Sequence, residues 1–462
     1  MRTFVDREQE LIYLEEEYTK KEASLIILYG RRRVGKTALL SKFMTGKTAF
    51  YFLVTEETEQ ANRSSFKEMV ADYTGNTLLK MAEVREWLPL FQVLADYRPQ
   101  EKLVLMIDEF QYLGKSNPAF PSVFQKIWDT MLKERNVMVI LCGSLISMME
   151  SQTLSYTSPL YGRRTGQIKL KQIPFRYYNE FFPDKSREEL IECYAVTGGV
   201  PKYIELFESG SDIYSDIQHN ILRKSSFLYD EPNFLLQREV TDIGTYYSII
   251  KTIAAGNRKL GKIAAVLETR QTGITRYLKT LIDLDILERE VPITEDNPEK
   301  SKRGLYQIKD NFILFWFKFI SPNLGMIETG HSDLAMQRIR QNFIDTHVSF
   351  VYEDICREKM WQLNAERKWD FTFEKVGRWW DNQEEIDLVA LDSNGKNIIF
   401  GECKYWKGPV GLDILAQLKR KAKNVEWNRD FRHEYYVLFS IHGFTEELKE
   451  YAASHANVLL MD

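Results

Sequence analysis

The stretch that most constrains the fold is residues 27–40, which read ILYGRRRVGKTALL. Within it, residues 30–37 match the Walker A pattern Gly-x-x-x-x-Gly-Lys-Thr. An apolar run at 24–29 predicts a buried strand before the pattern, and 37–44 can continue as a helix after it. This order points the N-terminus of a helix at bound phosphates. The stretch therefore predicts a nucleotide-binding loop, and a glycine-bearing turn with solvated arginines is the simpler alternative.

Each part of such a loop has its own task. Consecutive backbone N–H groups wrap the α- and β-phosphates, the Lys36 ammonium reaches the β- and γ-phosphates, and the Thr37 hydroxyl is a ligand of Mg²⁺. We therefore expect ATP and Mg²⁺ as cofactors. The residues expected to surround the phosphates are Gly30, Arg31, Arg32, Arg33, Val34, Gly35, Lys36, Thr37 and Ala38.

Composition narrows the class of protein. With 462 residues, 44% of them hydrophobic, the chain is long enough for two to four domains. A formal net charge of −4 gives no overall attraction to nucleic acid or to anionic membranes, so such contacts need local basic patches. The four cysteines are widely spaced, the N-terminus is charged, and the apolar runs are shorter than the roughly 20 residues of a membrane span. We expect a cytoplasmic protein with reduced thiols and no membrane contact.

The pattern along the chain predicts four regions. Short apolar strands alternate with helical stretches up to about residue 173, which favours an α/β fold with a mainly parallel sheet and helices on both faces. A helical region follows, and then three helical segments lead into two short strands separated by a polar loop, as in a winged helix. The expected boundaries are an ATPase domain at 1–175, a helical lid at 176–238, a winged helix-turn-helix at 239–325 and a C-terminal domain at 335–462.

Two acidic residues end one of the predicted strands. Asp108 and Glu109 follow the run LVLMI, so their carboxylates emerge at the edge of the sheet where ligands bind in open α/β folds. The aspartate can hold the Mg²⁺ water shell, and the glutamate can polarise the attacking water. The next strand ends at Ser144, whose hydroxyl could sense the γ-phosphate or simply cap a helix. A solvated turn is the alternative for the acidic pair.

The segment PLYGRRTG places Arg163 and Arg164 on a predicted turn. A guanidinium given to a neighbouring subunit would stabilise the charge of the transition state, which implies a homo-oligomer formed with nucleotide. Two solvated arginines on a surface turn are the alternative.

Five segments together carry a resemblance to a known family: FVDREQEL, GRRRVGKTALL, LMIDEFQYL, PLYGRR and TGGVPKY. They resemble the archaeal and bacterial P-loop ATPases allied to the STAND branch of AAA-like proteins, which carry a winged helix and a C-terminal domain of the DUF234 type. The resemblance covers essentially the whole chain. It implies that Phe4, Val5 and Arg7 contact the adenine and that Pro201, in a Gly-x-Pro element of the lid, reports the nucleotide. A proline that starts a helix is the alternative for Pro201.

The C-terminal region contains a predicted hairpin, EEIDLVALDSNGKNIIFGECKYWKG, with a turn at Asn394-Gly395. The alternation of strands places Glu402 and Lys404 on one face of the second strand and Asp387 within reach on the first. Two carboxylates can hold Mg²⁺ or Mn²⁺ beside a scissile phosphate, and the lysine can orient water or stabilise charge. Cross-strand pairs that merely stabilise a surface are the alternative.

This hairpin resembles the Asp…Glu-x-Lys element of PD-(D/E)xK nucleases, and hence a restriction-endonuclease-like α/β domain. The resemblance implies that Glu353, in the helical segment FVYEDICREKM, is the helix-borne acid and a third metal ligand. In the predicted winged helix, TRQTGITRYLKTL would be the recognition helix, with Thr275, Arg276 and Lys279 exposed to DNA phosphates or to solvent.

The sequence thus favours an ATP-hydrolysing switch that controls a metal-dependent nuclease-like domain acting on DNA. The alternative is a nucleotide-gated scaffold or DNA-binding regulator in which the C-terminal domain has no catalytic role.

Overall fold

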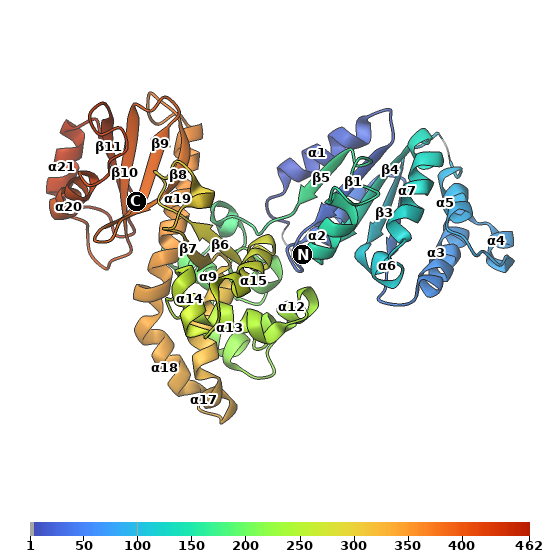
Figure 1. Cartoon of the computed structure of the whole chain (residues 1–462), viewed down its shortest axis with the longest axis horizontal. Coiled ribbons are helices and arrows are strands. Elements are labelled where there is room, and N and C mark those ends of the chain that lie inside the picture. Colours follow the sequence, from blue (N-terminus) through green and yellow to red (C-terminus); the bar gives the residue numbers. More distant parts are fainter. Residues whose placement is uncertain (1–3, 99) are drawn as a thin grey trace. The chain divides into compact units, whose positions relative to one another are not determined.

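The structure is a computed structural model that describes residues 4–98 and 100–462 (Figure 1). The chain divides into two compact units, and each is built from separate segments. The first unit contains the chain up to Phe181 together with Gly199–Glu205 and Asn233–Thr241. The second contains Phe182–Gly198, Leu206–Pro232 and Asp242–Asp462.

The first unit is built on a five-stranded parallel sheet, which confirms the α/β fold expected from the sequence. The strand order is β2-β3-β4-β1-β5, so β1, which leads into the phosphate loop, lies inside the sheet between β4 and β5. Strands β1, β3 and β4 are buried along their whole length because helices cover both faces. The strands are β1 Ser24–Tyr29, β2 Ala49–Leu53, β3 Leu103–Asp108, β4 Val137–Gly143 and β5 Gly166–Lys169.

Two groups of helices cover this sheet (Figure 1). On one face, Leu14 of α1 and Phe43 of α2 pack against aliphatic side chains such as Ile26 and Met106. On the other face, the core is aromatic, with Phe52 of β2 at 4.9 Å from Phe66 of α3 between ring centroids. The helices are α1 Glu8–Thr19, α2 Lys36–Met44, α3 Glu59–Thr74, α4 Thr77–Met81, α5 Leu88–Ala95, α6 Gln111–Ser116, α7 Phe120–Thr130, α8 Ile146–Met149, α10 Pro201–Ile204 and, for most of its length, α12 Glu231–Glu239.

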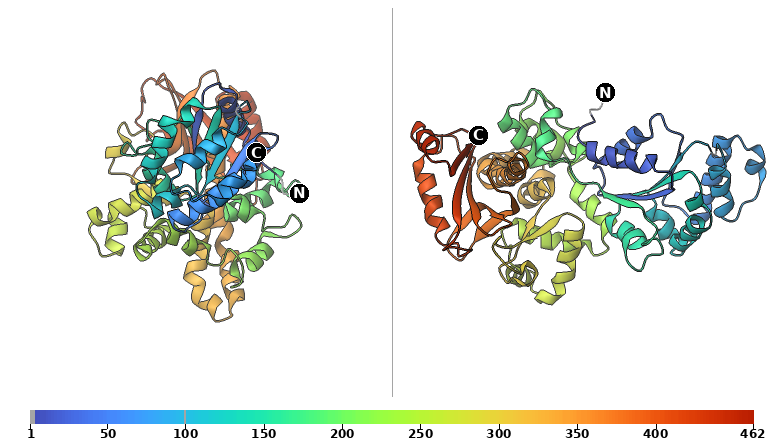
Figure 2. Two further views of the ribbon diagram at one scale, coloured as in Figure 1. Left: turned by 90° about the vertical axis from the view of Figure 1, so that its right-hand side faces the viewer. Right: turned by 90° about the horizontal axis from the view of Figure 1, so that it is seen from above.

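The second unit contains a mixed five-stranded sheet of order β12-β11-β10-β9-β8. Strand β9 pairs antiparallel with both β8 and β10. Strand β11 pairs parallel with both β10 and β12. Helices α20 and α21 pack on one face and α19 on the other (Figure 2). The strands are β8 Phe373–Trp380, β9 Glu385–Asp392, β10 Asn397–Lys404, β11 His433–Ser440 and β12 Val458–Met461. Trp379 is only 4% exposed, within the core of this sheet.

Three helices and a hairpin precede this sheet. Helices α13 Ile243–Ala254, α14 Leu260–Val266 and α15 Gln271–Asp283 are followed by the antiparallel strands β6 Leu287–Glu290 and β7 Leu305–Ile308. The remaining helices of the second unit are α9 Arg187–Thr197, α11 Ile213–Ile217, α16 Asn311–Phe315, α17 Leu324–Glu328, α18 Ser332–Phe343, α19 Ser349–Ala365, α20 Leu412–Ala422 and α21 Glu446–Ser454.

The region expected to be one helical lid at 176–238 is divided between the two units. Gly199 explains part of this division, because a Cβ at this position would lie 1.8 Å from the carbonyl oxygen of Ile173. The backbone of Gly199 accepts a hydrogen bond of 2.7 Å from Ile173, so this segment packs with the first unit. The division into four domains stays a prediction. Within the part of the chain that the structure describes, no helix is long and apolar enough to cross a membrane.

Candidate nucleotide site and a second acidic site

The phosphate loop connects β1 to α2 with a backbone that only certain residues can adopt. A Cβ at Gly30 would lie 2.3 Å from the carbonyl oxygen of Leu170, so no side chain fits there. Gly35 has φ of 95°, in the left-handed region that glycine adopts at no cost. Arg33 has φ of 70°, an uncommon conformation for a residue with a side chain. The two glycines of the pattern are therefore required by the shape of the loop.

Lys36 lies at the first position of α2 with its ammonium inside the loop. The Nζ atom donates hydrogen bonds to the carbonyl oxygens of Gly30 at 2.7 Å and Arg31 at 2.8 Å. Burial lowers the pKa of Lys36, and the nearby carboxylates of Glu109 and Asp108 act in the opposite direction. Thr37 and Ala38 follow on the exposed side of the helix, which leaves the Thr37 hydroxyl accessible to a metal ion.

Arg7 supports the phosphate loop. Its guanidinium donates to the carbonyl oxygens of Val34 at 3.2 Å and Lys171 at 2.5 Å, and it pairs with Glu10 at 3.4 Å. Burial lowers the pKa of Arg7. The sequence resemblance implied adenine contacts for Phe4, Val5 and Arg7. Arg7 and Val5 are buried, whereas Phe4 is half-buried with the Lys42 ammonium 3.9 Å from its ring centroid. Their contact with adenine stays a prediction.

Asp108 and Glu109 lie at the end of β3 and are held by neutral donors. Asp108 accepts hydrogen bonds from the Tyr51 hydroxyl at 3.1 Å and from the backbone N–H of Glu109 at 2.9 Å. The Glu109 carboxylate accepts from the Ser144 hydroxyl at 2.7 Å and from the Gln111 amide at 2.5 Å. Glu109 also has φ of 54°, so its backbone is held in a strained conformation. Ser144, at the end of β4, thus positions the carboxylate that would polarise water.

The three arginines of the loop lie around this edge of the sheet. Arg32 donates to the Ser144 hydroxyl at 3.4 Å and to the Tyr112 hydroxyl at 3.1 Å. Arg31 is buried, and Arg33 is half-buried with its pKa lowered by burial. Arg32 therefore lies beside Ser144, and the contact of the three arginines with a phosphate chain stays a prediction.

Glu239, the last residue of α12, is a member of this site that the sequence did not reveal. One oxygen of its carboxyl is buried and, among residues 4–98 and 100–462, accepts no hydrogen bond. The carboxyl also accepts the backbone N–H of Ile146, and its charged neighbours are Arg31, Lys36 and Arg32. Burial raises the pKa of Glu239 to about 7. No local pattern marks this residue, because it follows the loop by some two hundred positions in the sequence.

Pro201 begins α10 and lies beside the phosphate loop. Its Cγ atom is 3.9 Å from the position that a Cβ on Gly35 would take. The Gly-x-Pro element thus contacts the loop, while a report on the nucleotide through Pro201 stays a prediction. Arg163 forms an ion pair of 3.0 Å with Asp129, and Arg164 donates to the carbonyl oxygen of Tyr161 at 2.7 Å. The guanidinium groups of both arginines therefore have bonding partners within the first unit.

A second group of acids lies on the mixed sheet of the second unit. In the antiparallel register of β9 and β10, Asp387 falls opposite Glu402, one step beyond the paired Leu388 and Gly401. Asp387 accepts the backbone N–H of Cys403 at 2.9 Å. Burial, and next the charge of Glu402, raise the pKa of Asp387. The expected juxtaposition of these two acids is therefore present in the structure.

Basic side chains form ion pairs with two of the acids in this region, Glu402 and Glu353. The Glu402 carboxylate forms ion pairs with Lys404 at 2.7 Å and with Lys421 of α20 at 3.1 Å. Glu353 of α19 is paired with Arg378 of β8, and burial raises the pKa of Glu353. Lys421 was not foreseen from the sequence, because its role depends on where α20 packs. Within the described residues, no three His, Cys, Asp or Glu side chains are grouped as ligands of one metal ion.

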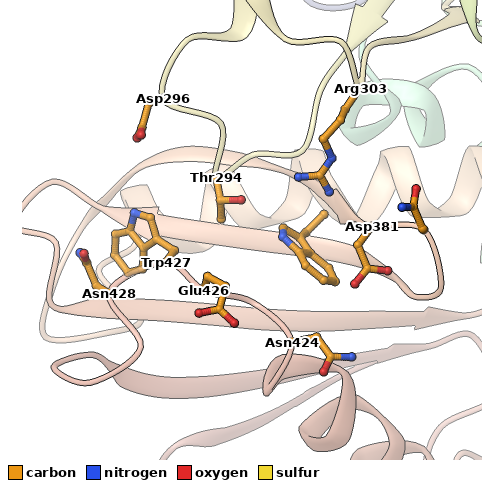
Figure 3. Close-up of a pocket in the computed structure, with 10 residues that line it drawn as sticks. Thr294, Asp296, Arg303, Asp381, Asn424, Glu426, Trp427 and Asn428 are labelled. Carbon is orange, nitrogen blue, oxygen red and sulfur yellow. The ribbon is translucent and has the colours of Figure 1, made fainter.

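A pocket of about 620 Å³ also lies in the second unit, between the β6–β7 loop and the segment after α20 (Figure 3). Asp296, Asp381 and Glu426 line it together with one cation, Arg303. Three carboxylates against one guanidinium disfavour a phosphate group, so this pocket does not suit a nucleic-acid backbone.

Comparison with known proteins defines the class. Residues 4–207 match a family described as an ATPase domain predominantly from Archaea, and residues 316–425 match archaeal and bacterial proteins of unknown function. The first unit is therefore a P-loop ATPase domain. An uncharacterized protein of Methanocaldococcus jannaschii is 40% identical over 438 residues, which cover 94% of this chain and 95% of that protein. The chain belongs to the family of this archaeal protein.

Two further comparisons agree with the ATPase domain. An uncharacterized ATP-binding protein of Methanocaldococcus jannaschii is 57% identical over 44 residues, which cover 10% of this chain and 75% of that protein. The solved structure of a Walker-type ATPase of Pyrococcus abyssi superposes with a TM-score of 0.52 at 20% identity, over 68% of this chain and 96% of that one. At this identity the likeness is one of fold alone.

Proposed function

We propose that the first unit hydrolyses ATP with Glu109 as the residue that polarises the attacking water. The observation that carries this proposal is the Glu109 carboxylate, which two neutral donors hold at the end of β3 in the electrostatic field of Lys36. A carboxylate held in this way keeps its charge available for a water molecule, because no cation among residues 4–98 and 100–462 is bonded to it. Its strained backbone is consistent with a position fixed for chemistry.

The other residues of the site would share the remaining tasks. Lys36 would exchange its two carbonyl contacts for the β- and γ-phosphates, which a compact cation binds well. Thr37 and Asp108 would hold Mg²⁺ on the side of the phosphates. Arg32 would carry the position of the γ-phosphate to Glu109 through Ser144, to which both are hydrogen-bonded.

The test is a steady-state ATPase assay with Mg²⁺ on the purified full chain. We expect hydrolysis in the wild type and none above background without the divalent ion. An isosteric Ser144→Ala variant should bind ATP normally and hydrolyse it about tenfold more slowly, because Glu109 loses one of its anchors. Equal turnover in the wild type and in Ser144→Ala would remove Ser144 from the mechanism.

We further propose that ATP controls a metal-dependent nuclease site at Asp387 and Glu402. The geometry that supports it is the pair of acids facing each other across β9 and β10, with Lys404 two residues after Glu402 on the same face. The pair fits a divalent ion whose other ligands are water and a phosphate oxygen. Near it, α20 ends in the basic run Lys419, Arg420 and Lys421, which suits the backbone of DNA.

Cleavage assays on linear, branched and single-stranded DNA, with Mg²⁺ or Mn²⁺ and with or without ATP, test this second proposal. Asp387→Ala and Glu402→Ala should each abolish metal-dependent cleavage, whereas Lys404→Ala should retain the metal and slow the chemical step. An exposed acid of the same unit, Glu366→Ala, is the matched control. Cleavage that survives in Asp387→Ala/Glu402→Ala would place the activity elsewhere.

A DNA-binding regulator without nuclease activity is the second candidate. It is favoured by the ion pairs that already balance Glu402 and Glu353. In this case α13, α14, α15 and the β6–β7 hairpin would act as a winged helix. Arg276 and Lys279 are exposed on α15, opposite the buried Ile274 and Leu278. Arg276→Ala/Lys279→Ala should then weaken DNA binding and lower its salt dependence, measured by fluorescence anisotropy.

The place and assembly of the protein are proposals as well. All four cysteines are free and buried, which suits a reducing cytoplasm. A homo-oligomer formed with nucleotide would allow Arg163 or Arg164 to act on a neighbouring subunit, provided that their present contacts are released.

A further inference from the structure

Glu239 has the surroundings of a residue that responds to the nucleotide. The segment 233–241 belongs to the first unit, although about ninety residues, strand β5 among them, separate it from β4 along the chain. Glu239 brings a negative charge to the side of the loop where three cations gather: Arg31, Arg32 and Lys36. Its buried, unpartnered oxygen is costly in free energy, so the structure around it must hold it in place.

The neighbours of Glu239 locate it along the phosphate chain. Lys36 is the residue of the loop that reaches the β- and γ-phosphates. Ile146, whose backbone N–H binds the carboxyl, follows Ser144 by two residues, and Ser144 holds the Glu109 carboxylate. In the proposed mechanism Glu109 faces the water that attacks the γ-phosphate. The carboxyl of Glu239 therefore lies toward the γ-phosphate end of the site.

From this placement we propose that Glu239 is the residue through which the site distinguishes ATP from ADP. The inference rests on the proposed phosphate site. The γ-phosphate and the Glu239 carboxylate carry charges of the same sign and require the same cations, so the carboxyl must be displaced or protonated before ATP binds fully. ADP has no γ-phosphate and leaves the carboxyl where it is. The ionised carboxylate thus lowers the affinity for ATP more than the affinity for ADP.

The position of Glu239 in the chain connects this competition to the second unit. Residues 233–241 are the last segment of the first unit, and the chain enters the second unit at Asp242, three residues after Glu239. A carboxyl displaced by the γ-phosphate moves the end of α12, and this movement is passed directly along the backbone to α13. The backbone after Glu239 therefore connects the γ-phosphate end of the site to the second unit.

The protonation of Glu239 predicts how nucleotide preference depends on pH. The groups that face this carboxyl are the cations of Arg31, Lys36 and Arg32 and the N–H of Ile146. Because the pKa of Glu239 is raised to about 7, most of the carboxyl is protonated at pH 6 and most of it is charged at pH 8. The preference for ATP over ADP should therefore rise as pH falls from 8 to 6.

The experiment measures the dissociation constants of a non-hydrolysable ATP analogue and of ADP, with Mg²⁺, by calorimetry at pH 8. In Glu239→Gln, which keeps the shape of the side chain, the analogue should bind about tenfold tighter while ADP changes by less than about twofold. Glu239→Asp keeps the charge and should retain a preference close to that of the wild type. Glu68→Gln, an exposed neutralisation on α3, is the matched control and should change neither constant.

The outcomes separate this inference from the proposed site. An unchanged preference for ATP over ADP in Glu239→Gln, or weaker binding of the ATP analogue, overturns the role of Glu239. Nucleotide binding itself is then unaffected. A wild type that binds neither nucleotide overturns the phosphate site instead. A second measurement follows the preference for ATP over ADP between pH 6 and pH 8, in the wild type and in Glu239→Gln. A preference that is the same at both pH values, or that changes equally in Glu239→Gln, also overturns the inference.

Discussion

Two pairs of acids at strand ends can be compared in this protein, and they differ in what surrounds them. Asp108 and Glu109 are bonded to hydroxyl, amide and backbone donors, which fix their direction without cancelling their charge. Glu402 is bonded to two ammonium groups, so its charge is already balanced. In the proposed mechanism the first site therefore takes a metal and a water without losing an ion pair, whereas at the second a metal must compete with lysines that are already in place.

The comparison shows that a pattern of acids in the sequence does not define a metal site by itself. Both pairs occupy the edge or face that the strand pattern predicted. What separates them is the partner of each carboxylate, and partners such as Lys421 come from distant segments. Four changes to the protein can break or sharpen this contrast, and they are taken from the largest expected effect to the smallest.

The largest effect is expected from Lys36→Ala. The substitution removes the ammonium that lies inside the phosphate loop, where it is held by the carbonyl oxygens of Gly30 and Arg31. We expect ATP affinity to fall by at least about a hundredfold, or about 2.7 kcal/mol, in calorimetric titrations. Lys126→Ala, an exposed lysine on α7, should have no effect. Unchanged affinity in Lys36→Ala would remove the phosphate loop from the site.

Glu109→Gln should separate chemistry from binding. The amide keeps the contacts with Ser144 in shape but cannot polarise water, so turnover should fall by about a hundredfold while ATP remains bound. Single-turnover and filter-binding measurements distinguish the two steps. Wild-type turnover in this variant would assign the base to another residue and would end the contrast between the two acidic sites.

Lys421→Met should bring the second site closer to the first. It removes one of the two ammonium groups from Glu402 and retains the apolar stem, so the site gains negative charge. We expect Mn²⁺ to bind several-fold more tightly, on the order of 1 kcal/mol, seen as a larger thermal shift with the metal.

Asp387→Ala/Glu402→Ala is the control for this measurement, because it should show no shift from this site. An undiminished Mn²⁺ shift in that double variant places the metal at the nucleotide site. The same result would take away the main physical support for the nuclease proposal.

The smallest effect is expected from Arg163→Ala, which should change the ATPase activity per molecule little at low protein concentration. Its guanidinium is paired with Asp129 on the surface of α7, and such exposed pairs contribute less than about 1 kcal/mol to the free energy of unfolding. If Arg163 acts on a neighbouring subunit, ATPase activity per molecule should rise with concentration in the wild type. A mixture of Arg163→Ala with Glu109→Gln should then regain part of the activity. Activity that is independent of concentration in a monomer excludes this role.

The sequence predicted those features that depend on local order or on the ends of parallel strands. The phosphate loop was predictable because its glycines and the strand before it are contiguous. Asp108 and Ser144 were predictable because β3 and β4 are parallel neighbours, so their ends meet at one edge. The approach of Asp387 to Glu402 followed from the alternation of side chains in a hairpin.

The remaining contacts arise from packing between distant segments, which no local pattern encodes. The pairing of Glu353 with Arg378 depends on α19 lying against β8. Glu239 reaches the phosphate loop only because residues 233–241 pack with the first unit. The lid expected at 176–238 was assigned from helical periodicity alone, which gives the type of an element but not the unit on which it packs.

The discontinuous first unit has a consequence for the newborn chain on the ribosome. All five strands of its sheet have been made by Lys169, but the segments that carry Pro201 and Glu239 are still to come. At a synthesis rate of about 5–20 residues per second, the chain needs roughly 3 to 12 s to extend from Phe181 to Thr241. Pro201 is made about a third of the way through this interval, and Glu239 only near its end. A nucleotide that binds then meets a sheet without Glu239, so the proposed discrimination between ATP and ADP would begin only when translation has passed the end of α12.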